Sequence, residues 1–177
     1  TTPESPGFII AKLNSLSDPD LIAALYRASA KGVQIKLNVR GVCTLIPGVA
    51  GLSENIEVCS VLGRYLEHGR MLYFRNGGSE ELYISSADWL QRNMKKRLEL
   101  LFPVFDKEIK ARCKDILNIY FADNTHAYRL KNDGTWIDLS LSRRPEDPLL
   151  YAQEKLYKMA RKTARNLEEK QEILQVR

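Results

Sequence analysis

Residues 8–41 constrain the fold most strongly, because a strand pattern, a helix pattern and a second strand pattern follow one another without a long gap. The stretch "FIIAKLN" at residues 8–14 is typical of a strand, and residues 33–41 alternate apolar and polar side chains as a strand with one buried face does. The intervening "SDPDLIAALYRASAKG" has apolar residues at helical spacing. This succession predicts a βαβ unit with a parallel pair of strands and a right-handed crossover.

Further strands are predicted by apolar runs that end at turn residues. The runs at residues 56–63 and 97–105 each predict one strand, and we expect the second of these to be largely buried because it is mostly apolar. Residues 70–87 and 127–139 each predict a hairpin, since each contains a glycine turn between two strand patterns. Hairpins are antiparallel, so together with the βαβ unit they predict an α/β fold with a mixed sheet flanked by helices.

The remaining segments predict helices and connections. Residues 106–123 have amphipathic helical spacing, and one long charged amphipathic helix is expected from Asp147 to the end of the chain. Residues 41–55 contain three glycines and a proline and predict a long loop. Residues 89–98 are interpreted as a short connection.

Composition excludes several classes of protein. Apolar residues make up 44% of the 177 residues, enough for a core without disulfide bonds. No apolar run reaches membrane-spanning length. Cys43, Cys59 and Cys113 are odd in number and widely spaced, which matches neither a disulfide framework nor a zinc site. We expect them to be reduced, as in a cytoplasmic protein.

The net charge of +5 divides unevenly along the chain. Residues 1–140, which we interpret as the main domain, carry a net charge of +2, and residues 141–177, interpreted as a C-terminal helical extension, carry +3. Nucleic-acid binding usually requires a strongly basic face, which a nearly neutral main domain does not favour. A few arginines focused in one cleft remain compatible with this charge.

Charged side chains occupy the ends of predicted strands, where α/β sheets bind ligands. Arg40 follows one strand and His68 precedes another, and His68 and Arg70 point to the same side if residues 68–70 are extended. Arginine suits phosphate because its permanent charge can bond two oxygens at once. A charged histidine can bond a phosphate oxygen or donate a proton to a leaving group. From the residues alone, a structural role is favoured for His68, and a solvated position at a strand end is favoured for Arg40.

Other polar and aromatic side chains are expected to support a site or to pack, rather than to bind phosphate themselves. Asn14 and Ser86 either orient a site by hydrogen bonds or belong to ordinary turn or strand structure. Asp88 can pair with a site arginine or cap the segment that follows it. Trp89 and Trp136 are expected to be packing residues rather than platforms for stacking.

A long, ordered series of short strings runs from about residue 8 to about residue 140. It comprises Asn14, "VRG" at residues 39–41, "GLSENI" at residues 51–56, "LEHGR" at residues 66–70 and "SADWLQRN" at residues 86–93. This series resembles the C-terminal portion of polyphosphate kinases.

The resemblance implies that the complete protein reversibly transfers the terminal phosphate of ATP to inorganic polyphosphate, with Mg²⁺ as cofactor and through a phosphohistidine. It implies a phospholipase D-like fold for residues 1–140, with the catalytic centre in a tunnel between this domain and a similar preceding one. The phosphorylated histidine and the main Mg²⁺ site would lie in that preceding domain, and no metal ligand is expected here. The family's nucleotide-phosphate contacts fall on Arg40 and His68, and Arg70 is a second-rank candidate. His68 is therefore expected to be catalytic as a partner in phosphoryl transfer, but not as its nucleophile.

The expected partners follow from the same resemblance. They are ATP or ADP, inorganic polyphosphate and the upstream domains of the same polypeptide, in a homo-oligomer without nucleic acid. A cytoplasmic location is expected, and association with a membrane is left open. The chain starts at Thr1 with the turn-like "TTPESPG", so it resembles a piece of a longer protein that would be inactive alone.

Two other functions remain open. The phospholipase D superfamily uses H-x-K, an aspartate after four further residues, and G-S-x-N. Here the first motif reads His68-Gly69-Arg70, the aspartate position holds Arg75, and residues 85–88 read "SSAD". The lost lysine and aspartate argue against a phosphodiesterase, which is the first alternative. The second is a non-catalytic module that binds polyphosphate or nucleic acid.

Overall fold

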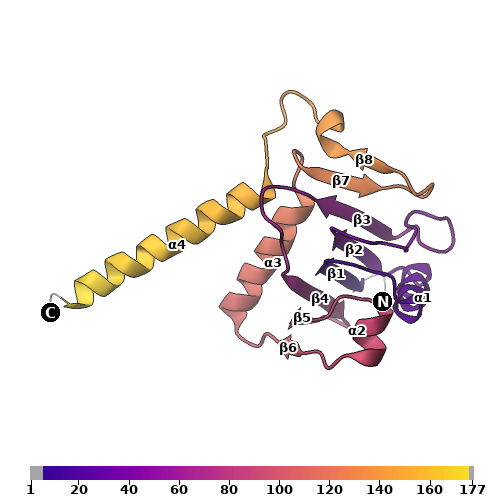
Figure 1. Ribbon diagram of the computed structural model, residues 1–177, viewed down its shortest axis with the longest axis horizontal. Helices are drawn as coiled ribbons and strands as arrows, with labels where there is room; N and C mark the ends of the chain where they lie inside the picture. The colour runs from indigo at the N-terminus through magenta and orange to yellow at the C-terminus, as the bar shows by residue number, and fades with distance from the viewer. Residues whose placement is uncertain (1–5, 176–177) are drawn as a thin grey trace.

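A single mixed sheet forms the centre of the fold. The computed structural model describes residues 6–175, with side chains up to residue 166, and Figure 1 shows its ribbon. In that part of the chain, eight strands follow one another across the sheet in the order β6-β5-β4-β1-β2-β3-β7-β8. The strands are β1 (Phe8–Leu13), β2 (Gln34–Val39), β3 (Ile56–Val61), β4 (Arg70–Asn76), β5 (Ser79–Ser85), β6 (Leu101–Pro103), β7 (Ala127–Leu130) and β8 (Trp136–Asp138).

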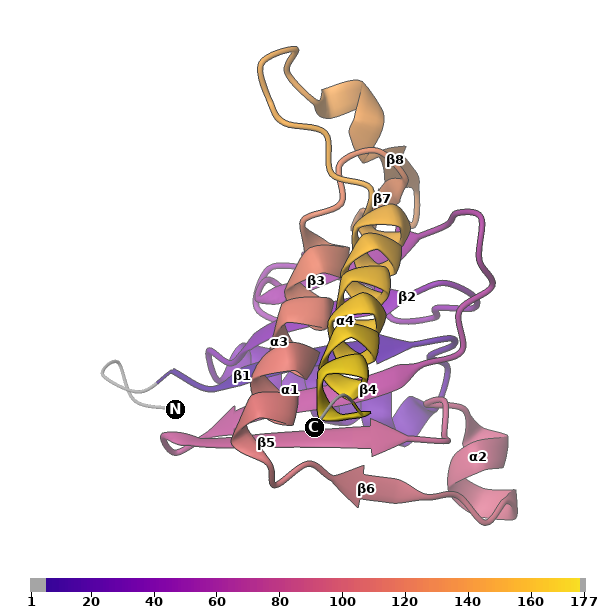
Figure 2. The same ribbon diagram turned by 90° about the vertical axis from the view of Figure 1, so that its left-hand side faces the viewer.

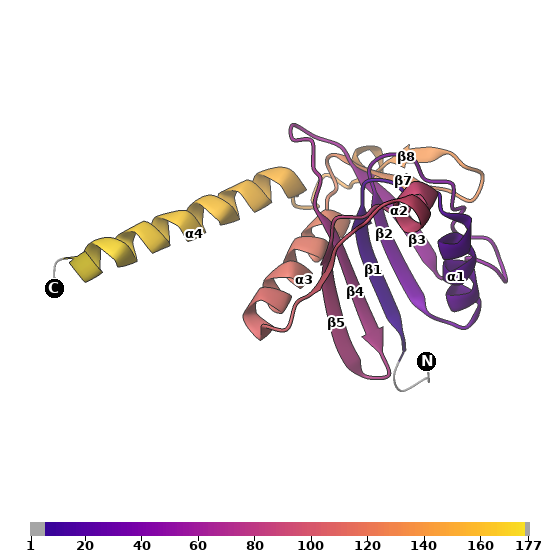
Figure 3. The ribbon, with the colours of Figure 1, turned by 60° about the horizontal axis from the view of Figure 1, so that its bottom comes forward.

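Helices cover both faces of this sheet. Figure 3 shows α1 (Pro19–Ala30) on one face and α3 (Lys107–Phe121) on the other. α4 (Ala152–Gln175) begins beside α3 and then extends away from the body, as Figure 1 shows, and Figure 2 looks toward the end of α4. α2 (Gln91–Lys96) and the 3-10 helix η1 (Leu139–Ser142) are short. None of the helices in the described residues combines the length and apolar character that a membrane span requires.

The predicted βαβ unit is confirmed. β1 and β2 are parallel neighbours, with Phe8 opposite Gln34, and α1 connects them. α1 begins where the Asp18 carboxylate accepts a hydrogen bond from the backbone N–H of Leu21 at 2.9 Å. Gly32 follows its end with a φ of +83°, a conformation that glycine adopts without steric cost.

Apolar side chains form a layer on each face of the sheet. The layer beneath α1 comes mainly from β1, β2 and β3, and it includes Ala11, Leu13, Ile35, Leu37, Val39 and Val58. On the other face, Tyr73 and Leu82 pack against Leu117 of α3. Ala152, at the start of α4, is fully buried and packs with Val61. The first turn of α4 is therefore part of the core, although the rest of that helix projects from the body.

Both predicted hairpins are confirmed. β4 and β5 are antiparallel and are joined by Gly77 and Gly78, which have φ values of +55° and +86°. Two consecutive positive φ angles give the tight turn whose twist matches the strands, and glycine is the residue that adopts them most easily. β7 and β8 are joined around Gly134, at a φ of +83°. With the parallel pairs, these hairpins confirm the expected α/β fold with a mixed sheet.

The strand predicted over residues 97–105 is wrong in length and in burial. β6 spans only Leu101–Pro103, and Leu101 and Phe102 are each 55% exposed. β6 is the last strand at one edge of the sheet and pairs with β5 alone. An apolar run cannot distinguish a central strand from an edge strand, because tertiary topology decides that position.

The connection at residues 89–98 contains a short helix that the sequence did not predict. α2 begins after Leu90, where no side chain caps the first turn, so the usual sequence signal for a helix start is missing. Trp89 and Asn93 are both buried and anchor this turn to the body. Tertiary packing therefore stabilises a helix that the local sequence signals do not predict.

The long C-terminal helix is present, but it begins at Ala152 rather than at Asp147. Asp147 pairs with Arg144 at 2.8 Å, and the N–H of Ala152 donates to Asp123 Oδ2 at 2.7 Å. These contacts hold the residues between them outside the helix. The last two residues of the predicted helix and residues 1–5 of the turn-like opening lie outside the described residues.

Candidate functional site

The candidate site lies where β1 and β2 end and where the loop at residues 62–69 approaches them. Arg40 directly follows β2, and Asn14 directly follows β1. The Nε–H of Arg40 donates to Asn14 Oδ1 at 2.8 Å and to the backbone carbonyl of Glu67. These bonds fix the guanidinium through its inner nitrogen and leave the outer nitrogens for other partners.

Arg40 and His68 are brought together at this point. Nη2 of Arg40 lies 3.4 Å from Nδ1 of His68. His68 is exposed and Arg40 is half-buried. The two side chains are close enough to contact the same phosphate group.

Arg70 is held by Asp88. Nε and Nη2 of Arg70 donate to the two carboxylate oxygens at 3.2 and 3.0 Å, and Nη1 donates to the backbone carbonyl of His68 at 2.9 Å. A guanidinium has five N–H donors, so three are engaged here and two remain. The structure thus places Asp88 in the first of its two expected roles, as the partner of a site arginine.

The Asp88 carboxylate also joins Arg70 to the end of β1. The backbone N–H groups of Asn14 and Ser15 donate to Asp88 Oδ1 at 2.7 and 3.2 Å. Burial acts to raise the pKa of Asp88, but hydrogen bonds from Arg70 and the two N–H groups outweigh burial and hold the pKa below its ordinary value. The carboxylate is therefore charged at neutral pH.

The ends of β1 and β2 approach each other closely. The N–H of Gly41 donates to the carbonyl oxygen of Asn14 at 2.7 Å, and a Cβ at residue 41 would lie 2.8 Å from that oxygen. Only glycine fits this approach without movement of the backbone. The buried Nδ2 of Asn14 has no hydrogen-bond partner among the described residues. An unused NH₂ group, with two N–H donors, therefore lies beside Arg40.

A buried ionic cluster adjoins His68. Lys12 on β1 is 3% exposed; its Nζ lies 3.1 Å from Glu67 Oε2 and donates to the carbonyl of Gly69 at 3.1 Å. Tyr120 of α3 donates its hydroxyl to the same Glu67 oxygen. Burial lowers the pKa of Lys12, although the nearby Glu67 carboxylate acts to raise it. Burial and the hydrogen bond to Glu67 both raise the pKa of Tyr120. The cluster fixes the residues on both sides of His68.

Sequence reasoning missed Lys12 and Glu67 as parts of the site. The signal for Lys12 was available, because a lysine within an apolar strand is almost always paired when it is buried. Its partner lies in a loop far along the chain, and strand periodicity does not identify such a partner.

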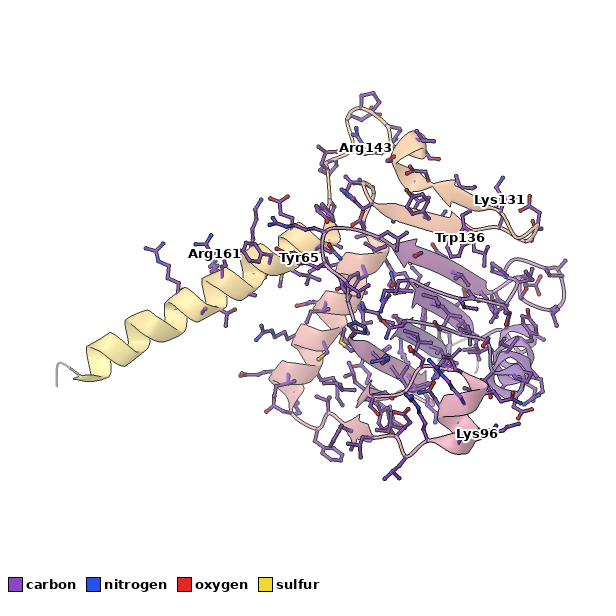
Figure 4. All side chains as sticks on the ribbon, in the orientation of Figure 1. Tyr65, Lys96, Lys131, Trp136, Arg143 and Arg161 are labelled. Atoms are coloured by element: carbon purple, nitrogen blue, oxygen red, sulfur yellow. The ribbon has the colours of Figure 1, made fainter. Side chains whose placement is uncertain are left out.

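The first turn of α4 holds the loop that carries His68. The side chain of Gln153 donates to the carbonyl of Tyr65 at 2.8 Å and to Glu67 Oε1 at 2.9 Å, and it accepts from the N–H of Tyr65 at 2.9 Å. Figure 4 shows Tyr65 beside the base of α4. The backbone of this loop is therefore tied to the helix on both sides of Tyr65.

Ser86 and the second histidine of the chain, His126, have partners outside this cluster. The ring of His126 stacks on Tyr151 with 3.9 Å between ring centroids, and the hydroxyl of Ser86 donates to Glu99. Among the described side chains, no three His, Cys, Asp or Glu residues gather in a way that would hold a metal ion. The side chains that do converge are cationic or neutral donors with a few carboxylates that pair with them.

Unused N–H donors on positive groups are the main chemical property of the site. The outer nitrogens of Arg40 have no hydrogen-bond contact among the described residues other than that of Nη2 with His68, Arg70 keeps two donors, and His68 is exposed beside them. Charge-assisted hydrogen bonds from such groups are the usual way to hold phosphate oxygens. The arrangement can therefore bind phosphate groups and offset the charge that develops when a phosphoryl group moves.

Comparison with known proteins identifies relatives of the whole domain. The family described as "Polyphosphate kinase C-terminal domain 2" matches residues 1–148. The polyphosphate kinase of Pseudomonas syringae pv. tomato is 54% identical over 132 residues, which cover 75% of this chain and 18% of that protein. The polyphosphate kinase of Rhodopirellula baltica is 52% identical over 151 residues, which cover 85% of this chain and 18% of that protein.

A solved structure has the same fold. The crystal structure of polyphosphate kinase from Porphyromonas gingivalis superposes with a TM-score of 0.85 at 37% sequence identity, over 92% of this chain and 24% of that chain. The expected phospholipase D-like α/β fold is thereby confirmed. The chain spans only 18% of the length of either curated relative named above.

Proposed function

Because the chain belongs to the polyphosphate kinase family, in which it corresponds to C-terminal domain 2, we propose that it forms one side of the active site of such a kinase. The complete protein reversibly transfers the terminal phosphate of ATP to inorganic polyphosphate. Its substrates are ATP or ADP and the polyphosphate chain. Upstream domains of the same polypeptide supply the other side of the site, and the whole protein works as a homo-oligomer.

One observation carries this proposal. Arg40 and His68 lie 3.4 Å apart at the strand ends, with donors that no described carboxylate engages. The Arg40 guanidinium binds phosphate oxygens and offsets their charge. His68 bonds a phosphate oxygen or donates a proton to the leaving oxygen. Arg70 adds its two remaining donors and fixes the backbone of His68.

The covalent step and the metal belong to the upstream part of the protein in this proposal. When bound, Mg²⁺ offsets charge on the phosphates. The upstream domain would hold that ion, as the family resemblance implies. The residues of this chain bind and orient phosphate groups, and the phosphorylated histidine faces them from the other side.

A cytoplasmic location is part of the proposal. Cys43, Cys59 and Cys113 are all free. Burial raises the pKa of Cys59 to about 12, which keeps that thiol protonated and unreactive. Reduced, inert thiols are typical of a reducing compartment.

Alanine at Arg40 or at His68 in the full-length protein tests the proposal. Each change removes a charged contact to phosphate, which should cost at least about 1.5–3 kcal/mol, so ATP-dependent polyphosphate synthesis should fall roughly tenfold or more. Synthesis is measured as incorporation of labelled phosphate from ATP into polymer, at saturating and at limiting ATP.

Arg75→Ala is the matched control, because Arg75 is an exposed arginine at the far end of β4. It should leave the rate unchanged, and none of the proteins should hydrolyse bis-p-nitrophenyl phosphate. Near-normal synthesis by folded Arg40→Ala and His68→Ala proteins would remove the assignment of the site.

A further inference from the structure

One face of α4 is strongly cationic. Residues 152–166 contain five basic residues and one acidic residue, Glu154, so their net charge is +4. At 3.6 residues per turn, the five basic positions fall within about 120° of the circumference of the helix, and all five side chains are exposed. This cationic stripe consists of Lys155, Lys158, Arg161, Lys162 and Arg165.

A pocket of about 560 Å³ lies where the stripe begins, at the base of α4. α4 contributes Lys155, Lys158 and Lys162 to its lining, and the chain before α4 contributes His126 and Tyr151. The stacking of His126 on Tyr151 fixes that part of the lining. The volume lies in the ordinary range of ligand pockets, and the lining gathers three lysines and a histidine.

This pocket is separate from the phosphate site. His68 borders a different pocket, to which α4 contributes Gln153 and Leu156, and the two pockets share no lining residue. Gln153 and Lys162 are nine residues apart, which places them on opposite sides of the helix, about 180° from each other. A ligand along the stripe therefore leaves the site around Arg40 and His68 free.

The lysines of the pocket are available to a ligand. Among the described side chains, Lys158 pairs with Glu154 at 2.7 Å, whereas Lys155 and Lys162 make no ion pair. Exposed pairs such as that of Lys158 contribute little to stability, so an anion of higher charge can replace Glu154. Like charges three and four residues apart on a helix repel each other. A bound polyanion would relieve this repulsion.

The length of the stripe indicates a linear ligand. Ten residues separate Lys155 from Arg165, which corresponds to about 15 Å along the helix axis. A single phosphate group reaches one or two of these side chains, whereas a linear polyanion with a charge on every unit reaches them all. Polyphosphate has this form.

Other polyanions fit the stripe less well. Single-stranded nucleic acid binds through aromatic side chains on which its bases stack, and the stripe itself contains no aromatic residue. A helix that lies on an anionic membrane inserts its apolar face into the lipid. On α4, Leu156 packs instead against the core of the domain. Both observations favour polyphosphate.

We propose that the cationic stripe and the pocket at its base form an accessory site for the polyphosphate chain, outside the phosphate site. The inference rests on the proposed function, because its ligand is the polymer of that reaction, and it adds a second contact away from the phosphate that is transferred. A chain held at two places dissociates less readily than a chain held at one, since rebinding at the second place is intramolecular. The stripe thus keeps the growing chain on the protein between transfers.

The triple substitution Lys155→Gln, Lys158→Gln and Lys162→Gln in the full-length protein tests this site. Loss of three cations should weaken the binding of long-chain polyphosphate roughly tenfold and lower the slope of log affinity against log salt by about two to three. The affinity for ADP and KM for ATP should stay unchanged, while the polymer made from ATP should become shorter. Fluorescence anisotropy of end-labelled polyphosphate measures the affinity, and gel electrophoresis measures the chain length.

Two control variants separate position from net charge. Lys96→Gln, Lys107→Gln and Lys131→Gln together remove the same charge from other exposed places. Figure 4 shows Lys96 and Lys131 on the body of the domain, away from Arg161 on α4. Thr163→Ala is an exposed change on α4 outside the stripe. Both controls should bind polyphosphate as the wild type does.

Three results would overturn the inference. They are unchanged polyphosphate affinity in the triple variant when circular dichroism shows it to be folded, an equal loss of affinity in the charge-matched control or for ADP, and tighter binding of single-stranded DNA or of phosphatidylserine vesicles than of polyphosphate at the same salt concentration. The anisotropy measurement does not depend on turnover. Weaker polyphosphate binding by the triple variant of a protein that makes no polymer would support the accessory site and contradict the proposed function instead.

Discussion

At the residue scale, charge pairing decides which cations stay available to a ligand. Arg70 and Lys12 are paired with the carboxylates of Asp88 and Glu67, whereas Arg40 is fixed by two neutral oxygens. A carboxylate partner would offset the charge of Arg40 and compete with phosphate for its donors. Arg40 is thus both positioned and uncompensated among the described residues, which is the property that a phosphate-binding arginine needs.

Asp88→Asn should destabilise the domain and release Arg70. The substitution removes a charged pair and weakens the acceptor for two backbone N–H groups. The pair is partly exposed, so we expect the free energy of unfolding at pH 7 to fall by about 1–3 kcal/mol. Urea denaturation of the wild-type and variant domains measures this difference.

The pH dependence of this effect follows from the direction of the pKa shift. The pKa of Asp88 is lowered in the folded state, so its contribution to stability is present above the pKa of an unfolded aspartate, about 3.9. That contribution is lost as the pH falls through the folded value. The stability difference between wild type and Asp88→Asn should therefore narrow below about pH 4. A difference that stays constant from pH 7 to pH 3 would contradict the charged pair.

The positions of individual residues in the fold were predictable where they depend on the local sequence. Arg40 and His68 stand out because strand ends are visible in the sequence and ligands bind there. Trp136 is 40% exposed rather than packed as expected, and this exposure was not predictable, since it depends on what the rest of the fold leaves uncovered beside β8. The pairing of Lys12 with Glu67 was not predictable either, because the fold determines which loop residue lies beside Lys12.

At the scale of elements, the loop before β4 depends on a helix that lies far along the chain. Gln153 is 4% exposed and bonds to both the N–H and the carbonyl of Tyr65. Glu67 of the same loop is bonded from β1, α3 and α4 at once. The position of His68 is therefore set by three elements, and α4 is one of the elements that hold its loop in place.

Gln153→Ala should loosen this loop without unfolding the domain. The loss leaves the backbone N–H and carbonyl of Tyr65 without their partners on α4, which costs about 0.5–1.5 kcal/mol for each hydrogen bond. Amide hydrogen exchange in residues 64–69 should accelerate, and polyphosphate synthesis by the full-length protein should slow. Thr163→Ala, an exposed change on α4, is the control. Equal exchange rates in the Gln153→Ala and wild-type proteins would show that the helix does not hold the loop.

Elements were predictable where turn and capping chemistry is local. The βαβ unit and both hairpins follow from alternation, a cap at Asp18 and glycines with positive φ. α2 and the short, exposed β6 were missed because packing and edge position determine them. α4 begins at Ala152 rather than at Asp147 for the same reason. Asp123 accepts a tertiary hydrogen bond from the N–H of Ala152, and Asp147 forms a local ion pair with Arg144 before the helix begins.

At the scale of the whole molecule, the domain has an exposed apolar surface of the kind that other protein domains contact. Leu98 and Phe105, which flank β6, are 98% and 84% exposed, and an apolar strip of this kind is typical of a contact surface. The relatives are several times longer than this chain, which spans 18% of their length. The proposed upstream domains would cover such a strip and complete the site around Arg40 and His68.

The most direct test of the account compares polyphosphate formation from ATP by the full-length protein and by the 177-residue chain alone. Both are assayed at equal molar concentration with Mg²⁺, and circular dichroism confirms that the shorter chain is folded. The account predicts sustained polymer formation by the full-length protein and none by the folded chain, because the account places the phosphorylated histidine in an upstream domain. Sustained synthesis by the 177-residue chain, or no synthesis by the intact protein, would contradict the account.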